Sequence, residues 1–296
     1  VVMGNEGAYG CNFEKALAWT KDYDHSRLTH YESAFHKGRG SKFDYSNLDL
    51  YSRIYPSFEE IRDYCESSPD KPYILCEYSH SMGNGAGDYE DYYRLIEKYE
   101  CICGGFVWEW CDHGIYKGQA EDGRSVFYYG GDHGEELHDG NFCMDGLVYP
   151  DRRPHMGLYE YKNVHRPARV VSFDQEKGIL LLVNKLNFTG LKDYVKLFYE
   201  VTCDGHITES GWIREEDIAE IHPHEEGILP LAIAIPRKGR VFLKIKYFLK
   251  KADGLREEGH FLGFDEIPLK NEDGANQTVK EWLEKWDARS YEVSDD

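Results

Sequence analysis

The chain has 296 residues, 41% of them hydrophobic and 15% aromatic, which suffices for one large domain or two ordinary ones with real cores. With 54 acidic against 35 basic residues, its net charge is −19 at pH 7. A field of that sign repels phosphates, which argues against nucleic acids and anionic membranes as partners and favours a neutral substrate. The 23 tyrosines and six tryptophans weakly favour a carbohydrate, because aromatic faces stack on the apolar faces of sugars.

The first part of the chain, to about residue 165, alternates short apolar runs with helical patterns. Helical spacing predicts a helix over about 12–21, a second that follows a capping box of Ser57 and Glu60, and a third that follows Asp88. This alternation is typical of parallel strands joined by right-handed helical crossovers. The runs predicted as strands are 1–3, 27–32, 48–55, 73–78 and 104–110.

The pattern changes near residue 165. Beyond it, apolar and polar residues alternate with a period of two, for example over 195–201 and 241–247. This period predicts an antiparallel, immunoglobulin-like β-sandwich over 166–268. The tail, 269–296, is polar at first and then apolar, and we interpret it as a linker or the start of a further domain.

Two glutamates each follow an apolar run that is predicted to be a strand, Glu6 after 1–3 and Glu77 after 73–76. Barrel enzymes keep their chemistry at the carboxyl ends of strands, and two carboxylates there can divide the roles of acid and nucleophile that break a glycosidic bond. Either glutamate alone is more simply a surface residue. Because so little chain precedes Glu6, we expect most of its strand to lie outside this sequence and the chain to be a piece of an enzyme.

The eight cysteines show no regular zinc-type spacing. We interpret them as buried thiols of a reducing compartment and expect a cytoplasmic protein. No run of about eighteen apolar residues is present that would span a bilayer, and no membrane partner is expected.

Five segments resemble the large β-galactosidases of glycoside hydrolase family 2 and occur in the same order as in that family. The most distinctive is Cys-Glu-Tyr-x-His-x-Met-Gly-Asn, which is hard to match by chance. The resemblance implies the second half of a TIM (β/α)8 barrel over 1–165, followed by the sandwich. It also implies retaining hydrolysis of terminal β-D-galactosides through a covalent galactosyl-enzyme intermediate. The five segments are 4–6, 74–84, 104–110, 129–132 and 142–148.

By this resemblance, Glu6 is the general acid and base, and Glu77 is the nucleophile. The acid must hold its proton near neutral pH, whereas the nucleophile must be ionised. Tyr51 matches the family tyrosine that hydrogen-bonds the nucleophile, and such a bond lowers the pKa of a carboxylate. Core packing is the simpler alternative for one tyrosine among 23.

Four further residues are implied in substrate binding: Asn5, His80, Trp108 and Asp145. His80 corresponds to a histidine that contacts sugar hydroxyls, and Trp108 to an aromatic residue on which the sugar stacks. A structural histidine and a core tryptophan are the alternatives for these two.

The resemblance also implies cations in the intact enzyme. Phe142, through its carbonyl, and Asp145 match a sodium site beside the sugar's 6-hydroxyl, although the family commonly has asparagine where this chain has Asp145. Glu6 matches a magnesium ligand whose partners lie upstream of this sequence. One carboxylate holds an octahedral cation poorly, so we do not expect Mg²⁺ to be bound by the chain alone. We do not expect Na⁺ either, because position 145 departs from the family pattern and the resemblance places the remaining sodium ligand upstream of this sequence.

Two alternatives stay open. One is a β-glucuronidase or β-mannosidase of the same family, which would share both glutamates. The other is a non-catalytic carbohydrate-binding or structural module. We expect a β-galactoside as the substrate of the intact enzyme, a homo-oligomer, and no activity in the isolated chain.

Overall fold

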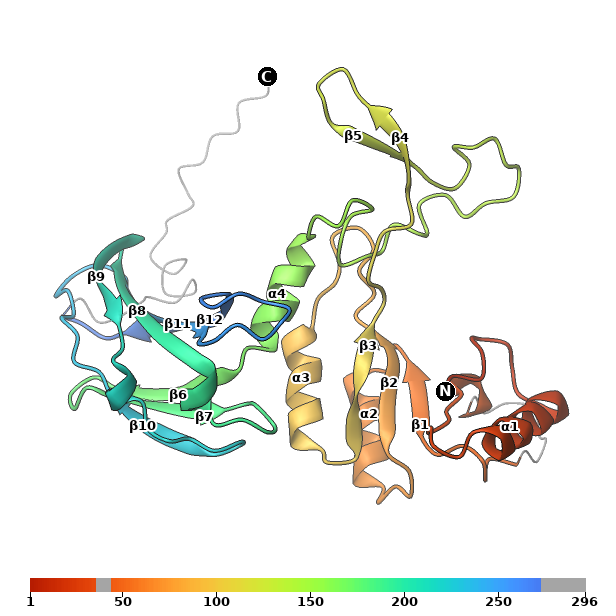
Figure 1. Ribbon diagram of the computed structural model, residues 1–296, viewed down its shortest axis with the longest axis horizontal. Coiled ribbons are helices and arrows are strands. Elements are labelled where there is room, and N and C mark those ends of the chain that lie inside the picture. The colour runs from red at the N-terminus through yellow and green to blue at the C-terminus, as the bar shows by residue number, and fades with distance from the viewer. Residues whose placement is uncertain (36–43, 273–296) are drawn as a thin grey trace, which may run out of the picture. The chain divides into compact units, whose positions relative to one another are not determined.

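The computed structural model describes residues 1–35 and 44–272 (Figure 1). The chain divides into two compact units, Val1–Val164 and His165–Asp296. The sequence pattern predicts this boundary one residue later, after residue 165. Most of the predicted linker, from residue 273 on, lies outside the described residues.

The first unit is built on a parallel sheet whose strands follow one another in chain order, β1-β2-β3. Helices connect the strands, as the alternating pattern predicted. The capping box is confirmed: Ser57 Oγ accepts a hydrogen bond from Glu60 N at 3.2 Å, and Glu60 Oε2 accepts one from Ser57 N at 2.8 Å. The elements are β1 (Tyr51–Ile54), α2 (Phe58–Glu66), β2 (Tyr73–Tyr78), α3 (Tyr89–Lys98), β3 (Ile102–Val107) and α4 (Met156–Val164).

The core of this unit lies where the helices cover the sheet. Ile61 of α2, Leu75 of β2 and Leu95 of α3 belong to one buried cluster, to which α4 adds Val164. The cluster holds the strands in register, and so fixes the positions of the residues at their carboxyl ends.

The runs 1–3 and 27–32 form less strand than predicted. They meet in one parallel bridge, Val2 with His30, in which His30 N donates to Val1 O at 3.0 Å and Met3 N donates to His30 O at 3.2 Å. In the sequence, helix α1 (Cys11–Tyr23) lies between the two runs, and a short 3-10 turn, η1 (Glu32–Phe35), begins at the last residue of the second.

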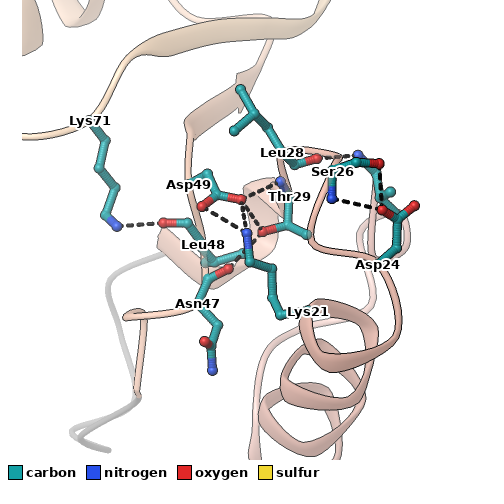
Figure 2. Close-up of polar contacts among 10 residues, drawn as sticks. Lys21, Asp24, Ser26, Leu28, Thr29, Asn47, Leu48, Asp49 and Lys71 are labelled. Carbon is teal, nitrogen blue, oxygen red and sulfur yellow. Dashed lines mark hydrogen bonds and ion pairs between the residues drawn. The ribbon is translucent and has the colours of Figure 1, made fainter.

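Asp49 connects these N-terminal segments to the start of β1 (Figure 2). Its Oδ2 accepts hydrogen bonds from Lys21 Nζ at 2.8 Å, from Thr29 N at 2.7 Å and from Thr29 Oγ1 at 2.9 Å. In the same place, Thr29 O accepts from Asp49 N and Leu50 N. Lys71 Nζ donates to Leu48 O and so joins the segment before β2 to this network. The bridge strand at His30 is therefore held beside β1.

A hairpin that the sequence reasoning missed follows β3, with strands β4 (Ile115–Gln119) and β5 (Ser125–Tyr128). The chain then returns, and Val148 forms a parallel bridge with Cys111. Gly146 sits so close to this segment that an added Cβ would lie 2.2 Å from Asp112 N, so only glycine fits. Gly146 N also donates to Asp112 Oδ1 at 2.8 Å. These contacts bring the residue before Gly146 up against the end of β3.

The second unit has two antiparallel sheets, in the strand orders β10-β7-β6 and β12-β11-β8-β9. Because apolar residues alternate with a period of two, every second side chain of a strand faces the core. The core contains Leu182, Leu197, Leu243 and Ile245. The predicted β-sandwich architecture is thus confirmed. Its elements are β6 (Ala168–Asp174), β7 (Ile179–Asn184), α5 (Leu191–Tyr194), β8 (Val195–Cys203), β9 (His206–Trp212), η2 (Glu215–Asp217), β10 (Glu226–Pro230), β11 (Val241–Leu249) and β12 (Phe261–Leu269).

Asp265 is the centre of a partly buried polar network in this unit. Arg166 Nη2 donates to its Oδ1 at 2.6 Å, and Arg166 Nε donates to its Oδ2 at 3.2 Å. Tyr247 OH and Val170 N also donate to Oδ2, at 2.5 and 3.1 Å. The network joins β12 and β11 to β6 and to the segment that enters the unit.

All eight cysteines are free, and none is fully buried: Cys11 and Cys103 are exposed and the other six are half-buried, so the prediction of buried thiols is wrong. Cys11 opens α1, and Cys103 lies on the face of β3 opposite to the buried Ile102. Among the described residues, no helix has the length and apolar character needed to cross a membrane.

Candidate active site

Glu77 lies at the carboxyl end of β2, beside the residue that follows β1. Tyr55 N donates to Glu77 O at 2.8 Å, and the Tyr55 hydroxyl makes a hydrogen bond to the Glu77 carboxylate. Burial raises the pKa of Glu77. The hydrogen bond from Tyr55 and the charge of His80 oppose this shift, whereas the charges of Glu6 and Glu32 add to it.

Tyr51 does not occupy the place expected for it. Its ring stacks on Tyr64 with 4.0 Å between centroids and meets Tyr73 edge to face at 5.0 Å, within the core of the first unit. Tyr51 begins β1, whereas Tyr55 follows its last residue and has a left-handed φ of 43°. The tyrosine bonded to Glu77 is therefore the one at the carboxyl end of the strand, and the assignment to Tyr51 is corrected to Tyr55.

Glu6 lies in an exposed loop just after the Val2 bridge. The hydroxyl of Tyr31 accepts a hydrogen bond from Gly7 N at 3.0 Å and donates one to Ala8 O at 3.1 Å, which holds the loop. Glu6 is close enough for its charge to raise the pKa of both Glu77 and Tyr55. The two predicted carboxylates thus share one electrostatic environment.

A cavity of about 490 Å³ opens beside Glu77. Of the residues predicted to bind substrate, Asn5 and Trp108 line it. Its walls combine two carboxylates with aromatic and aliphatic groups, a mixture that suits a ligand with both hydroxyls and apolar faces. The lining residues are Val2, Gly4, Asn5, His30, Glu32, Cys76, Glu77, Phe106 and Trp108.

Asp145 joins the other predicted site residues to one another. It is buried, with 2% of its surface exposed. Its Oδ2 accepts a hydrogen bond from Trp108 Nε1 at 3.1 Å and lies 3.4 Å from His80 Nε2. The His80 ring lies 5.7 Å from that of Tyr55 and stacks at 5.7 Å on Phe142. The structure therefore brings His80, Trp108, Phe142 and Asp145 together near Glu77.

Glu109, which the sequence reasoning did not single out, makes a carboxyl pair with Asp145. Burial raises the pKa of Glu109 to about 7, and the hydrogen bond to Asp145 and that residue's charge add to the shift. His113 Nε2, 3.4 Å from Glu109 Oε2, opposes it. Near neutral pH, Glu109 therefore still carries its proton in part of the molecules, because a second negative charge beside Asp145 is unfavourable.

Glu32 was also missed. It is buried, lines the cavity, accepts a hydrogen bond from Ser33 Oγ at 2.5 Å, and its charge raises the pKa of Glu77. A signal for it was present: Glu32 ends the strand-like run 27–32, just as Glu77 comes at the end of its own run.

The residues fit the two expected cations differently. Asp145 Oδ1 is buried and has no hydrogen-bond partner, so a monovalent cation would satisfy it. For magnesium, the described ranges contain no group of three or more His, Cys, Asp or Glu side chains placed to hold a metal. Glu6 therefore lacks, within 1–35 and 44–272, the partners that an octahedral site needs.

Comparisons with known proteins agree on a class of enzyme. Residues 2–170 match the model of the glycosyl hydrolases family 2 TIM barrel domain. Residues 180–270 match the model of β-galactosidase domain 4. The chain therefore belongs to glycosyl hydrolase family 2, and its fold is part of the TIM barrel domain followed by a β-sandwich domain.

Among its relatives, the β-galactosidase of Actinobacillus pleuropneumoniae is 46% identical over 270 residues, which are 91% of this chain and 26% of that protein. The β-galactosidase of Staphylococcus xylosus is 42% identical over 287 residues, 96% of this chain and 28% of that protein. The chain thus spans about a quarter of the length of these relatives. The match to a solved β-glucuronidase of Parabacteroides merdae covers 87% of this chain and 33% of that protein's chain. With a TM-score of 0.36 and 12% identity, this likeness is too remote to bear on function.

Proposed function

We propose that this chain supplies the two catalytic carboxylates of a retaining glycoside hydrolase that acts on terminal β-D-galactosides. The observation that carries the proposal is the environment of Glu77, at the carboxyl end of a barrel strand, bonded to Tyr55 and within the field of Glu6. The family match and the β-galactosidase relatives support it.

In this mechanism the Glu77 carboxylate attacks the anomeric carbon while Glu6, as the acid, gives its proton to the leaving oxygen. The product is a galactosyl ester of Glu77. Glu6, now a carboxylate, takes a proton from water, and this water attacks the anomeric carbon and releases Glu77. Burial raises the pKa of Glu77, and the hydrogen bond from Tyr55 opposes this rise, which favours the ionised form that attacks.

Charge around the site favours a neutral sugar over a uronic acid. Glu6, Glu32, Glu77 and Asp145 each act on the pKa of a neighbouring site residue, so several carboxyl groups share this region. A glucuronide would bring another carboxylate into the same field, and the described lining of the cavity contains no lysine or arginine to offset the repulsion. This supports the galactosidase proposal over the glucuronidase alternative. It does not distinguish galactose from mannose.

We propose that Asp145 and the Phe142 carbonyl hold sodium in the intact enzyme. The unpartnered Oδ1 of Asp145 supports this. The ion would supply positive charge beside a sugar hydroxyl. Magnesium at Glu6 stays a proposal of the family resemblance, with partners outside the described residues.

The test of the two roles is a pair of substitutions in the intact protein. Glu77→Gln should abolish turnover of a nitrophenyl β-galactoside, because an amide is no anionic nucleophile. Glu6→Ala should hydrolyse substrates with good leaving groups, and azide should restore its rate by replacing the water that Glu6 activates. The exposed Glu59→Gln serves as the control and should keep full activity. Wild-type activity in Glu77→Gln would refute the nucleophile assignment.

We also propose that the isolated chain does not turn over galactosides. Its described barrel strands form an open sheet with β1 and β3 at the edges. The other two predicted strands pair only through the bridge of Val2 with His30, so the described strands do not complete the wall of a closed barrel. Open edges with free backbone groups recruit partners, and self-association of the chain is the expected consequence. A galactoside assay with light scattering on the isolated chain tests this. A monomer that turns over the substrate would contradict it.

A further inference from the structure

The second unit contains a cavity of about 570 Å³. It lies where β8 begins and β9 ends, and its wall includes Trp212, Glu215 and Lys250. All of its lining residues belong to the second unit and lie within the described part of the chain. A cavity of this size suits a small ligand or a few linked sugar rings.

Trp212 forms an aromatic platform at this cavity. Its ring meets Phe198 edge to face, with 5.0 Å between centroids and 68° between planes, and is tilted against Phe248 at 5.2 Å. Phe248 in turn contacts Phe261 at 5.5 Å, so the indole belongs to a row of rings that crosses β9, β8, β11 and β12. Despite this support, 57% of the Trp212 surface is exposed. A large apolar face is therefore held in place and left open.

Two ion pairs, each between a lysine and a glutamate, line the cavity together with the Trp212 indole. Lys196 forms an ion pair with Glu258, and Lys250 Nζ donates to Glu215 Oε1 at 2.6 Å and to Lys192 O at 3.0 Å. The ionisable side chains of the lining are thus two cations and two anions, with no net charge. Such a site has no preference for phosphate or for a metal ion. It offers instead donors and acceptors alternating beside an aromatic face.

We propose that this cavity is a second saccharide site that binds neutral oligosaccharides without hydrolysing them. A pyranose ring has an apolar face formed by its C–H groups, which fits the indole, and hydroxyls at its edge, which fit lysine donors and glutamate acceptors together. The proposal does not depend on the proposed catalytic function, because none of the catalytic residues contributes to the cavity.

The test is NMR titration of the full 296-residue chain with β-1,4-galactotetraose as the probe. The Trp212 indole N–H resonance, assigned by its loss in Trp212→Phe, should shift with saturation, whereas inorganic phosphate should leave it in place. Affinity electrophoresis in a galactan gel gives the effect of each variant. Trp212→Ala should weaken binding by tenfold or more, and Trp212→Phe, which keeps an aromatic face, by less.

Trp19→Ala is the matched control, because Trp19 is 65% exposed on α1 of the first unit and should not affect binding. Circular dichroism identifies a variant that has unfolded, and Trp212→Phe then still tests the proposal through its partial loss. An unmoved Trp212 resonance at millimolar saccharide would overturn the proposal. So would equal binding by Trp212→Ala, or a shift caused by a proline-rich peptide and not by the saccharide.

Discussion

The hydroxyl of Tyr55 is hydrogen-bonded to the carboxylate of Glu77, while the main chains of the same two residues are joined by a bond of 2.8 Å from Tyr55 N to Glu77 O. The side-chain contact is thus fixed by the pairing of β1 with β2. It lowers the pKa of a carboxyl group that burial raises, and so it bears directly on the fraction of Glu77 that is ionised.

Tyr55→Phe in the intact enzyme should therefore raise the pKa of Glu77 and shift the acidic limb of the kcat/KM profile for a nitrophenyl galactoside to higher pH. A lost hydrogen bond to a charged group corresponds to roughly tenfold to a hundredfold in rate. Tyr51→Phe is the control and should leave the acidic limb unchanged, because the Tyr51 ring packs against Tyr64 and Tyr73. The reverse result, with the limb moved by Tyr51→Phe alone, would restore the sequence-based assignment.

The raised pKa of Glu109 should make the free energy of unfolding depend on pH. Its pKa is about 7 in the folded chain and near 4.5 in the unfolded chain, so between these values the folded state binds more protons. The free energy of unfolding should fall as pH rises from 5 to 8, by at most about 3 kcal/mol. Glu109→Gln should flatten this slope in urea titrations, whereas the exposed Glu100→Gln should retain it. Parallel slopes for wild type and Glu109→Gln would show that the pair with Asp145 does not hold a proton.

The lowered pKa of Asp49 should make the folded chain less stable at acid pH. Burial opposes ionisation, but the hydrogen bonds from Lys21 and Thr29 prevail and lower the pKa of Asp49 below 3.8. Its contribution is present above the unfolded pKa and is lost as pH falls through the lower folded value. At pH 7, Asp49→Ala should cost about 2 to 4 kcal/mol, because partly buried donors lose their acceptor (Figure 2).

Asp122→Ala is the comparison for Asp49, since Asp122 pairs with Arg124 on the surface and should cost less than about 1 kcal/mol. Denaturant unfolding at pH 7 and pH 3 measures both variants. If the cost of Asp49→Ala were the same at the two pH values, the low pKa would not contribute to stability.

Asp265 is expected to be the most sensitive polar residue of the second unit. Asp265→Ala removes the carboxylate to which Arg166 and Tyr247 donate in a region of low exposure, and should cost about 3 to 5 kcal/mol. Its neighbour Glu266 pairs with Lys244 at 2.8 Å on the outer face, and Glu266→Ala should cost about 1 kcal/mol or less. Thermal unfolding followed by circular dichroism compares the two, and similar melting temperatures would contradict the difference.

The sequence predicted the architecture well where local pattern decides it. β2 (Tyr73–Tyr78) lies where its apolar run places it, and the Ser57 capping box forms. The runs 1–3 and 27–32 carry the same apolar signal but pair over a single bridge, because the extent of pairing depends on neighbouring strands and not on the run itself.

The candidate site could be predicted where a local sequence segment identifies its residues, and not where contacts between distant segments form it. Glu77 and His80 stand in a distinctive segment, whereas the choice between Tyr51 and Tyr55 depends on the residue at which β1 ends and on the left-handed turn at Tyr55. Glu109 and Asp145 are 36 positions apart, and no local period indicates their contact, which the close approach of Gly146 to Asp112 produces.

The most direct measurement of the central claim is active-site labelling of the intact enzyme with 2-deoxy-2-fluoro-β-D-galactosyl fluoride. The fluorine at C2 destabilises the positively charged transition states, while fluoride at C1 leaves readily, so the glycosyl ester accumulates. Peptide mass spectrometry should find the 2-fluorogalactosyl group on Glu77, and Glu77→Gln should remain unlabelled. A 2-fluorogalactosyl ester on Glu6, Glu32 or Glu109 in place of Glu77 would contradict the account.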